Sequence, residues 1–140
     1  MQWSESEIEN LSPILEQVLA DLEPLNGKKT LVLCSGAGQI ALWLAKRATQ
    51  ARILGVELDD GLLAAARLSA EEKGLSHFVE FRKAEKTRLG FPDNTFDRLV
   101  SEFIIFPTPA PTQIGQPEMA RVLRPGGKMV ITAPGCRRPV

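Results

Sequence analysis

A chain of 140 residues is about one domain long, and its 17 basic residues balance its 17 acidic ones. This balance gives no electrostatic reason to expect nucleic acid or an anionic membrane as a partner. The sequence has no signal-peptide pattern and no apolar run near the roughly 20 residues of a membrane span, so we expect a cytoplasmic protein. Its two cysteines, Cys34 and Cys136, are too few for a disulfide framework or a metal cluster, and we expect no metal site.

Residues 1–26 predict an N-terminal helical segment. One helix start lies at Ser4, and a second lies just before Pro13, because proline suits the first position of a helix. An apolar stripe at helical spacing follows this second start: Ile14, Leu15, Val18, Leu19 and Leu22. Gly27 then ends the segment.

Residues 27–140 alternate between predicted strands and helices. The expected strands are Thr30–Cys34, Arg52–Glu57, Phe78–Arg82, Arg98–Glu102 and Lys128–Ala133. The expected helices are 38–49, a helix capped by Asp59 or Asp60 that stops at Gly74, and one from Pro117 through Leu123 that Pro125-Gly126-Gly127 breaks. Such alternation implies right-handed crossovers and a parallel sheet covered on both faces. We therefore expect a single α/β domain that binds its ligand beyond the carboxyl ends of the strands.

The turn after the first strand, GAGQIA from Gly36 to Ala41, allows two interpretations. Together with Glu57 about 20 residues on, it satisfies the dinucleotide fingerprint G-x-G-x-x-A, which predicts a nicotinamide-dependent oxidoreductase. Alternatively, the turn admits an adenosine-containing ligand that has no pyrophosphate. The glycines by themselves leave both interpretations open.

Two later segments accompany this turn, VEFRKAEKTRLGFPDNTFDRLVS from Val79 and EMARVLRPGGKMVITAP from Glu118. With LVLCSGAGQIALWLA and ILGVELDD, they resemble the class I S-adenosylmethionine-dependent methyltransferases of the small-molecule type, from about Leu25 to Pro134. The resemblance implies a three-layer Rossmann-like parallel sheet of strand order 3-2-1-4-5. It also implies S-adenosylmethionine as the cofactor and a small, apolar or aromatic molecule as the methyl acceptor.

The resemblance assigns the methionine and ribose parts of the cofactor to five residues. Gly36 and Gly38 would lie against the methionine portion, in a turn that also contains Cys34 and Ser35. Glu57 would accept from the two ribose hydroxyls, a task that suits a carboxylate because it has two acceptor oxygens.

The remaining implied cofactor-binding residues surround the adenine and the amino acid end. Leu58 would flank the adenine beside the small residue Ala84, and Glu85 would accept from the adenine amino group. Lys86 would offer its backbone amide to the ring. Ser101, at the end of the fourth strand, would lie near the amino acid end of the cofactor.

Two positions depart from the family pattern. Val32 stands where the family has an acid that helps to hold the cofactor ammonium, and Cys34 stands where it has the first glycine. Losing a charge-assisted hydrogen bond costs on the order of 1.5–3 kcal/mol, so we expect weaker cofactor binding. This keeps open a second function, a non-catalytic S-adenosylmethionine-binding or regulatory module with the same fold.

The family's sixth and seventh strands have no counterpart in this chain. Either the sequence is a piece of a longer protein, or the apolar fifth strand is covered by self-association. A homodimer through the edge of that strand is therefore one expectation.

The sequence assigns no catalytic residue. A sulfonium methyl is already activated, so catalysis of its transfer is mostly positioning and exclusion of water. Glu102 is the one acid considered as a base. The substrate side would be built from the apolar segment 103–115 and the N-terminal helices; alternatively, the apolar residues 103–106 are core residues that close the sheet. His77 is interpreted as a solvated loop histidine.

Overall fold

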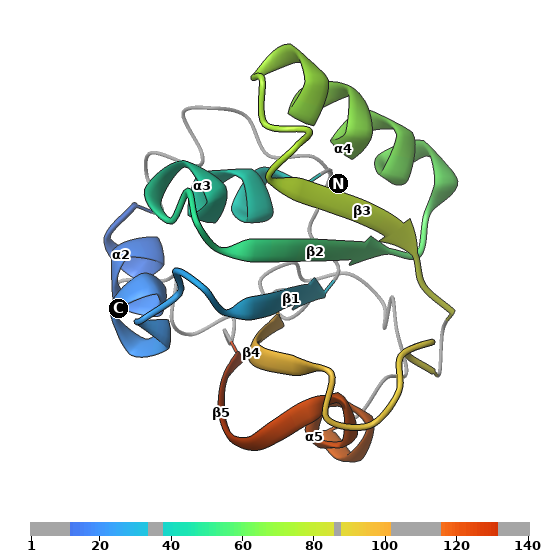
Figure 1. The fold of residues 1–140 in the computed structure, drawn as a ribbon. Helices are drawn as coiled ribbons and strands as arrows, with labels where there is room; N and C mark the ends of the chain where they lie inside the picture. Colours follow the sequence, from blue (N-terminus) through green and yellow to red (C-terminus); the bar gives the residue numbers. More distant parts are fainter. Residues whose placement is uncertain (1–11, 34–37, 86–87, 102–115, 132–140) are drawn as a thin grey trace, which may run out of the picture.

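The computed structural model describes residues 12–33, 38–85, 88–101 and 116–131, which form one sheet with helices packed on it (Figure 1). The elements in chain order are α2 (Ser12–Leu22), β1 (Lys29–Leu33), α3 (Gln39–Arg47), β2 (Arg52–Glu57), α4 (Asp60–Glu72), β3 (Val79–Lys83), β4 (Phe96–Ser101), α5 (Gln116–Val122) and β5 (Leu123–Ile131). The first predicted helix, from Ser4, lies outside the described residues, as do the segments 34–37, 86–87 and 102–115.

The strands pair in parallel in the order β3-β2-β1-β4-β5, which confirms the predicted topology. The strand order reverses at β1, because β1 lies between β2 and β4. Leu33 at the end of β1 is in register with Val56 on one side and with Ser101 on the other. The carboxyl ends of β1, β2 and β4 therefore meet at one end of the sheet.

Helix α4 shows how local sequence sets an element. Its N-cap is Asp59, whose Oδ2 accepts from the backbone N–H of Leu62 at 2.8 Å, so the structure selects Asp59 over Asp60. Gly74, which follows the helix, has φ +69°, a conformation that glycine adopts at little cost. The start and the end of this helix were both predicted.

Helices α2, α3 and α4 cover one face of the sheet, the first face (Figure 1). Its core holds Val32 of β1, Phe81 of β3 and Val100 of β4, all 3% exposed or less. The helices contribute Leu15, Val18, Leu22, Ile40, Ala41, Leu44, Leu63, Ala66 and Ala70 to the same cluster.

The opposite, second face is covered by α5 through Met119 and Val122. These two side chains pack in a cluster with Leu31, Leu33, Leu54, Val56, Leu89, Phe96 and Leu99. Helices thus pack on both faces. Toward β2 and β3 the second face carries the exposed polar residues Arg52, Glu80 and Arg82.

The predicted break at Pro125-Gly126-Gly127 is wrong, and so is the placement of Leu123 in the helix. Strand β5 begins at Leu123, which pairs with Phe96, whereas Lys128 already pairs with Arg98. Between these two pairs, β5 advances by five residues and β4 by only two, and Gly126 in β5 has φ +81°. The glycines make this irregularity possible, because they allow a positive φ and a close approach to the β4 backbone while pairing continues.

The end of α2 is tied to the sheet by two basic residues of neighbouring strands. The buried Arg98 of β4 donates through Nε to the carbonyl of Leu22, and Lys128 of β5 donates through Nζ to the carbonyl of Glu23 at 2.8 Å. Cations are favourable at a helix C-terminus, where the last carbonyls have no partner within the helix. The end of α2 is in this way fixed to β4 and β5.

Candidate functional site

The carboxyl edge, where β1, β2, β3 and β4 end at Leu33, Glu57, Lys83 and Ser101, brings part of the predicted site together. Glu57 is in register with Lys83, and the backbone N–H of Ala84 donates to the carbonyl of Glu57 at 2.9 Å. The chain segments that carry Glu57 and Ala84 are thus joined directly.

Glu57 has a fixed and buried carboxyl group. The residue is 6% exposed, and its Oε1 accepts from the backbone N–H of Leu58 at 3.0 Å. A carboxylate has about four lone-pair positions, so it can accept several hydrogen bonds at once, from hydroxyl groups as well as from a backbone N–H. Such a group suits a ligand with two adjacent hydroxyls.

The other predicted residues at this edge differ in exposure. Leu58 and Ala84 are half-buried, whereas Glu85 is exposed. Beside them, Lys83 Nζ lies 2.7 Å from Asp60 Oδ1, an ion pair that joins the end of β3 to the start of α4. Glu57, Leu58, Ala84 and Glu85 therefore form one continuous group.

Gly38 is required by packing. It precedes α3 with φ +83°, and a Cβ there would lie 2.6 Å from Phe81 Cζ and 2.9 Å from Ala66 Cβ. A side chain at this position would separate α3 from β3 and α4. The other predicted residues of the turn, Cys34, Ser35 and Gly36, lie outside the described residues.

Ser101 and Val32 lie at the carboxyl half of the two central strands. Ser101 is completely buried at the end of β4, next to Leu33. Val32, at the position where the family has an acid, is completely buried in the apolar cluster of the first face. The structure thus surrounds this position with apolar side chains. Lys86 and Glu102 lie outside the described residues.

Two motifs of the sequence are joined by one arginine. Arg121 of α5 forms a bidentate pair with Glu118, with Nε–Oε1 and Nη2–Oε2 distances of 2.8 Å. It also reaches the β3–β4 loop, where Nη1 lies 2.8 Å from Asp93 Oδ1 and Nη2 donates to the carbonyl of Leu89 at 3.0 Å. Glu118 Oε2 in turn accepts from the backbone N–H of Leu89 at 2.8 Å.

These contacts perturb the ionisation of both partners. The pKa of Glu118 is lowered to about 2, chiefly by the hydrogen bond from Arg121 and also by the Leu89 N–H, while burial opposes both. The hydrogen bonds from Glu118 and Asp93 raise the pKa of Arg121 above its ordinary value. Sequence reasoning missed this cluster, although the three-residue spacing of Glu118 and Arg121 on a helix was a signal for the pair.

Asp97 has a structural role at the opposite end of the sheet. Its Oδ2 accepts from the backbone N–H of Lys29 at 3.0 Å, and its Oδ1 lies 3.0 Å from Arg124 Nη1. The Lys29 hydrogen bond and then Arg124 lower the pKa of Asp97, against the opposing effect of burial. The side chain joins the starts of β1, β4 and β5.

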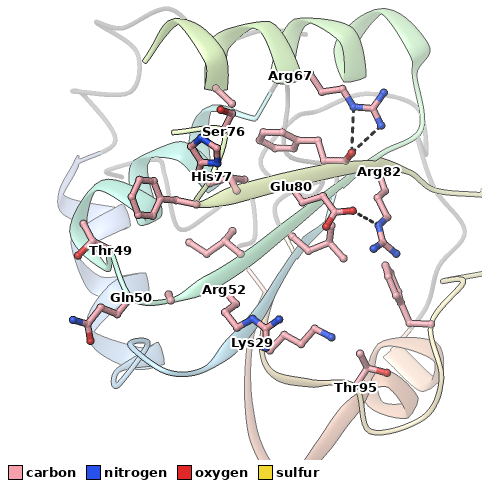
Figure 2. Close-up of a pocket in the computed structure, with 18 of the residues that line it drawn as sticks. Lys29, Thr49, Gln50, Arg52, Arg67, Ser76, His77, Glu80, Arg82 and Thr95 are labelled. Atoms are coloured by element: carbon pink, nitrogen blue, oxygen red, sulfur yellow. Dashed lines mark hydrogen bonds and ion pairs between the residues drawn. The ribbon is translucent and has the colours of Figure 1, made fainter. Parts of the chain in front are cut away.

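Figure 2 shows an open depression of about 1170 Å³ along β3 and the start of β2. Its lining includes Gln50, Arg52, Ser76, His77 and Phe91, and it contains none of the predicted cofactor-binding residues. His77 is exposed there, as expected for a loop histidine. This depression is distinct from the carboxyl edge.

Neither a metal site nor a membrane-spanning helix is found in the part of the chain that the structure describes. No three His, Cys, Asp or Glu side chains gather there as a possible metal site. Within the same residues, no helix combines the length and the apolar character needed to cross a membrane.

The strand order and the acid at the end of β2 are those of a Rossmann-like domain for an adenosine-containing ligand. The family model described as "Methyltransferase domain" matches residues 31–131, so the chain belongs to this family, whose methyl donor is S-adenosylmethionine. This match favours the methyltransferase interpretation of the glycine turn over the nicotinamide one.

Several known proteins are similar to this chain. A demethylmenaquinone methyltransferase of Thermus thermophilus is 38% identical over 104 residues, which are 74% of this chain and 46% of the relative. A phosphatidylethanolamine N-methyltransferase of Cereibacter sphaeroides is 36% identical over 107 residues, 76% of this chain and 52% of the relative. The crystal structure of the [4+2]-cyclase SpnF has a TM-score of 0.76 at 27% identity, covering 95% of this chain and 47% of that one. The chain spans about half the length of these relatives.

Proposed function

We propose that the protein binds S-adenosylmethionine at the carboxyl edge and transfers its methyl group to a small molecule. The observation that carries this proposal is the buried, backbone-held carboxylate of Glu57, whose neighbour Val56 is in register with Leu33, the last residue of β1. This carboxylate fits the ribose because it can accept from two neighbouring hydroxyls. The bound cofactor supplies a methyl group that its sulfonium has already activated.

The other residues of the proposed site are assigned to different parts of the cofactor. Leu58 and Ala84 flank the adenine, and Glu85 accepts from its amino group. Their continuity with Glu57 supports this division, because the Ala84 N–H is bonded to the Glu57 carbonyl. The methionine portion lies against the turn and the end of β4, and Lys86 presents its backbone amide to the ring. The residues proposed for the methionine portion are Cys34, Ser35, Gly36, Gly38 and Ser101.

The chain's contribution to methyl transfer is positioning and exclusion of water. We assign no catalytic acid or base. An apolar or aromatic small molecule is the proposed acceptor, with the apolar segment 103–115 on the substrate side. Relatives named for a quinone precursor and for a lipid support an apolar acceptor.

Calorimetric titration with S-adenosylhomocysteine tests the proposed site. We expect Glu57→Gln to weaken binding about 10- to 100-fold, since one charge-assisted acceptor is lost while an oxygen remains for the Leu58 N–H. Glu80→Gln is the matched control, because Glu80 is an exposed acid paired with Arg82 on the second face. This variant should bind S-adenosylhomocysteine as tightly as the unmodified chain. NAD should not bind to the unmodified chain.

Two results would contradict this proposal. The first is no heat of binding at millimolar S-adenosylhomocysteine. The second is equal affinity of the unmodified chain and Glu57→Gln, because the ribose would then lie elsewhere.

A second candidate is a module that keeps the fold and binds the cofactor without methyl transfer. The apolar surroundings of Val32 favour it, as does the similarity to a chain described as a cyclase. A methyl-release assay over a panel of small nucleophiles separates the two candidates. Cofactor binding without any release would favour the second.

We also propose self-association through β5, in the cytoplasm. Within the described residues β5 is the last strand of the sheet, so no described strand pairs with its outer edge. An apolar strand edge with unpaired N–H and C=O groups is a template for pairing with another chain. Two copies related by a twofold axis would cover both edges at once.

A further inference from the structure

The loop between β3 and β4 is anchored on both sides of Glu85. Before it, the Ala84 N–H is bonded to the Glu57 carbonyl at 2.9 Å. After it, Leu89 is held on α5 by hydrogen bonds to Glu118 and Arg121, and its side chain is 1% exposed. Only four residues separate Ala84 from Leu89, and each spans at most about 3.6 Å. The two anchors therefore restrict the place of Glu85.

The second anchor depends on the planar fork of one guanidinium. Arg121 binds both carboxylate oxygens of Glu118 and the Leu89 carbonyl, and Glu118 Oε2 also accepts the Leu89 N–H. The two side chains are 33% and 22% exposed, so water competes only in part. A lysine ammonium cannot reproduce this geometry, because it is a point charge without a fixed fork.

We propose that Glu118 and Arg121 are positioning residues for the adenine end of the cofactor site. They hold Leu89 on α5, and through Leu89 they set the place from which Glu85 accepts from the adenine amino group. The pair thereby sets the preference for an adenine nucleoside over one that lacks the amino group. This inference rests on the proposed function.

The test compares two ligands that differ at one position of the base. The dissociation constants of S-adenosylhomocysteine and S-inosylhomocysteine, which has a carbonyl in place of the amino group, give a selectivity ratio. We expect the unmodified chain to prefer the adenine ligand by about tenfold or more, since a carboxylate facing a carbonyl gains no hydrogen bond. Arg121→Lys and Glu118→Gln should each lower this ratio at least about threefold, toward the value of Glu85→Ala.

The selectivity ratio distinguishes a loss of Glu85 positioning from a general loss of stability. A merely structural defect weakens both ligands equally and leaves the ratio unchanged. Arg124→Gln is the matched control, because Arg124 lies three residues further on and pairs with Asp97 at the opposite end of the sheet. Its ratio should equal that of the unmodified chain. Circular dichroism establishes that each variant is folded, and Arg121→Lys, which retains the charge, is the milder change.

The outcomes distinguish this inference from the proposed function. Normal binding by the unmodified chain with unchanged ratios in Arg121→Lys and Glu118→Gln would overturn the inference alone. An unmodified chain that binds neither nucleoside would overturn the proposed function and the inference together. A ratio that also falls in Arg124→Gln would show a nonspecific effect and overturn the inference.

Discussion

At the scale of single residues, Gly38 has a packing role that its motif does not reveal. The sequence pattern assigns this glycine to a ligand. The structure adds that its φ of +83° and the rings and methyls of Phe81 and Ala66 exclude a side chain. Gly74 has a similar φ of +69° but open space around it. A side chain at either position would meet backbone strain, but only at Gly38 would it also meet a steric clash.

We expect Gly38→Ala to lower the free energy of unfolding by about 2–4 kcal/mol, the sum of left-handed strain and overpacking. Gly74→Ala should cost only about 1–2 kcal/mol, because the strain acts there alone. Urea denaturation of both variants measures the difference. Equal losses would mean that the start of α3 moves away from Phe81 without cost.

At the scale of elements, Glu118 and Arg121 join α5 to the β3–β4 loop, through hydrogen bonds to Leu89 and an ion pair of Arg121 with Asp93. The pKa of Glu118 is lowered from 4.5 to about 2 in the folded chain. A carboxyl whose folded pKa is depressed stabilises the fold above its unfolded pKa, and this contribution is lost as the pH falls through the folded value. The stabilisation that this carboxylate gives to the fold should therefore decline as the pH falls from about 4.5 to about 2.

Glu118→Gln should lower the free energy of unfolding at pH 7, on the order of 1–2 kcal/mol, because a charge-assisted bond is replaced by a neutral one. The difference from the unmodified chain should narrow between about pH 4.5 and pH 2, where the unmodified carboxyl also becomes neutral. Denaturation of both chains across this pH range measures the difference in free energy of unfolding. Glu80→Gln is the control, since an exposed ion pair contributes little at any pH. If the difference in free energy of unfolding between the unmodified chain and Glu118→Gln does not depend on pH, the charge of Glu118 does not stabilise the fold.

At the scale of the whole molecule, the two faces of the sheet are covered unequally. Among the described residues, three helices cover the first face, and Arg98 of β4 and Lys128 of β5 tie the end of α2 to these two strands. In the described part of the chain, α5 is the single helix on the second face. The most apolar edge is β5, which ends the sheet on the side of α5.

We expect sedimentation equilibrium to give a mass of twice the 15.4 kDa of the chain, because pairing of two β5 edges satisfies backbone groups on both copies. The association should depend little on salt, since backbone pairing is not an interaction between exposed charges. A mass of one chain across the concentration range, or dissociation at high salt, would contradict pairing through β5.

The sequence by itself determined the alternation of strands and helices, the order of the sheet and the acid at the end of β2. The alternation follows from local signals: apolar runs, a capping aspartate, and glycines where φ is positive. The order of the sheet followed from the resemblance to the class I methyltransferases. The irregular start of β5, the packing role of Gly38 and the contact of Arg121 with Leu89 were decided by the tertiary structure. Each depends on residues 20 or more positions apart, and the energy of such a contact exists only once the sheet has brought its partners together.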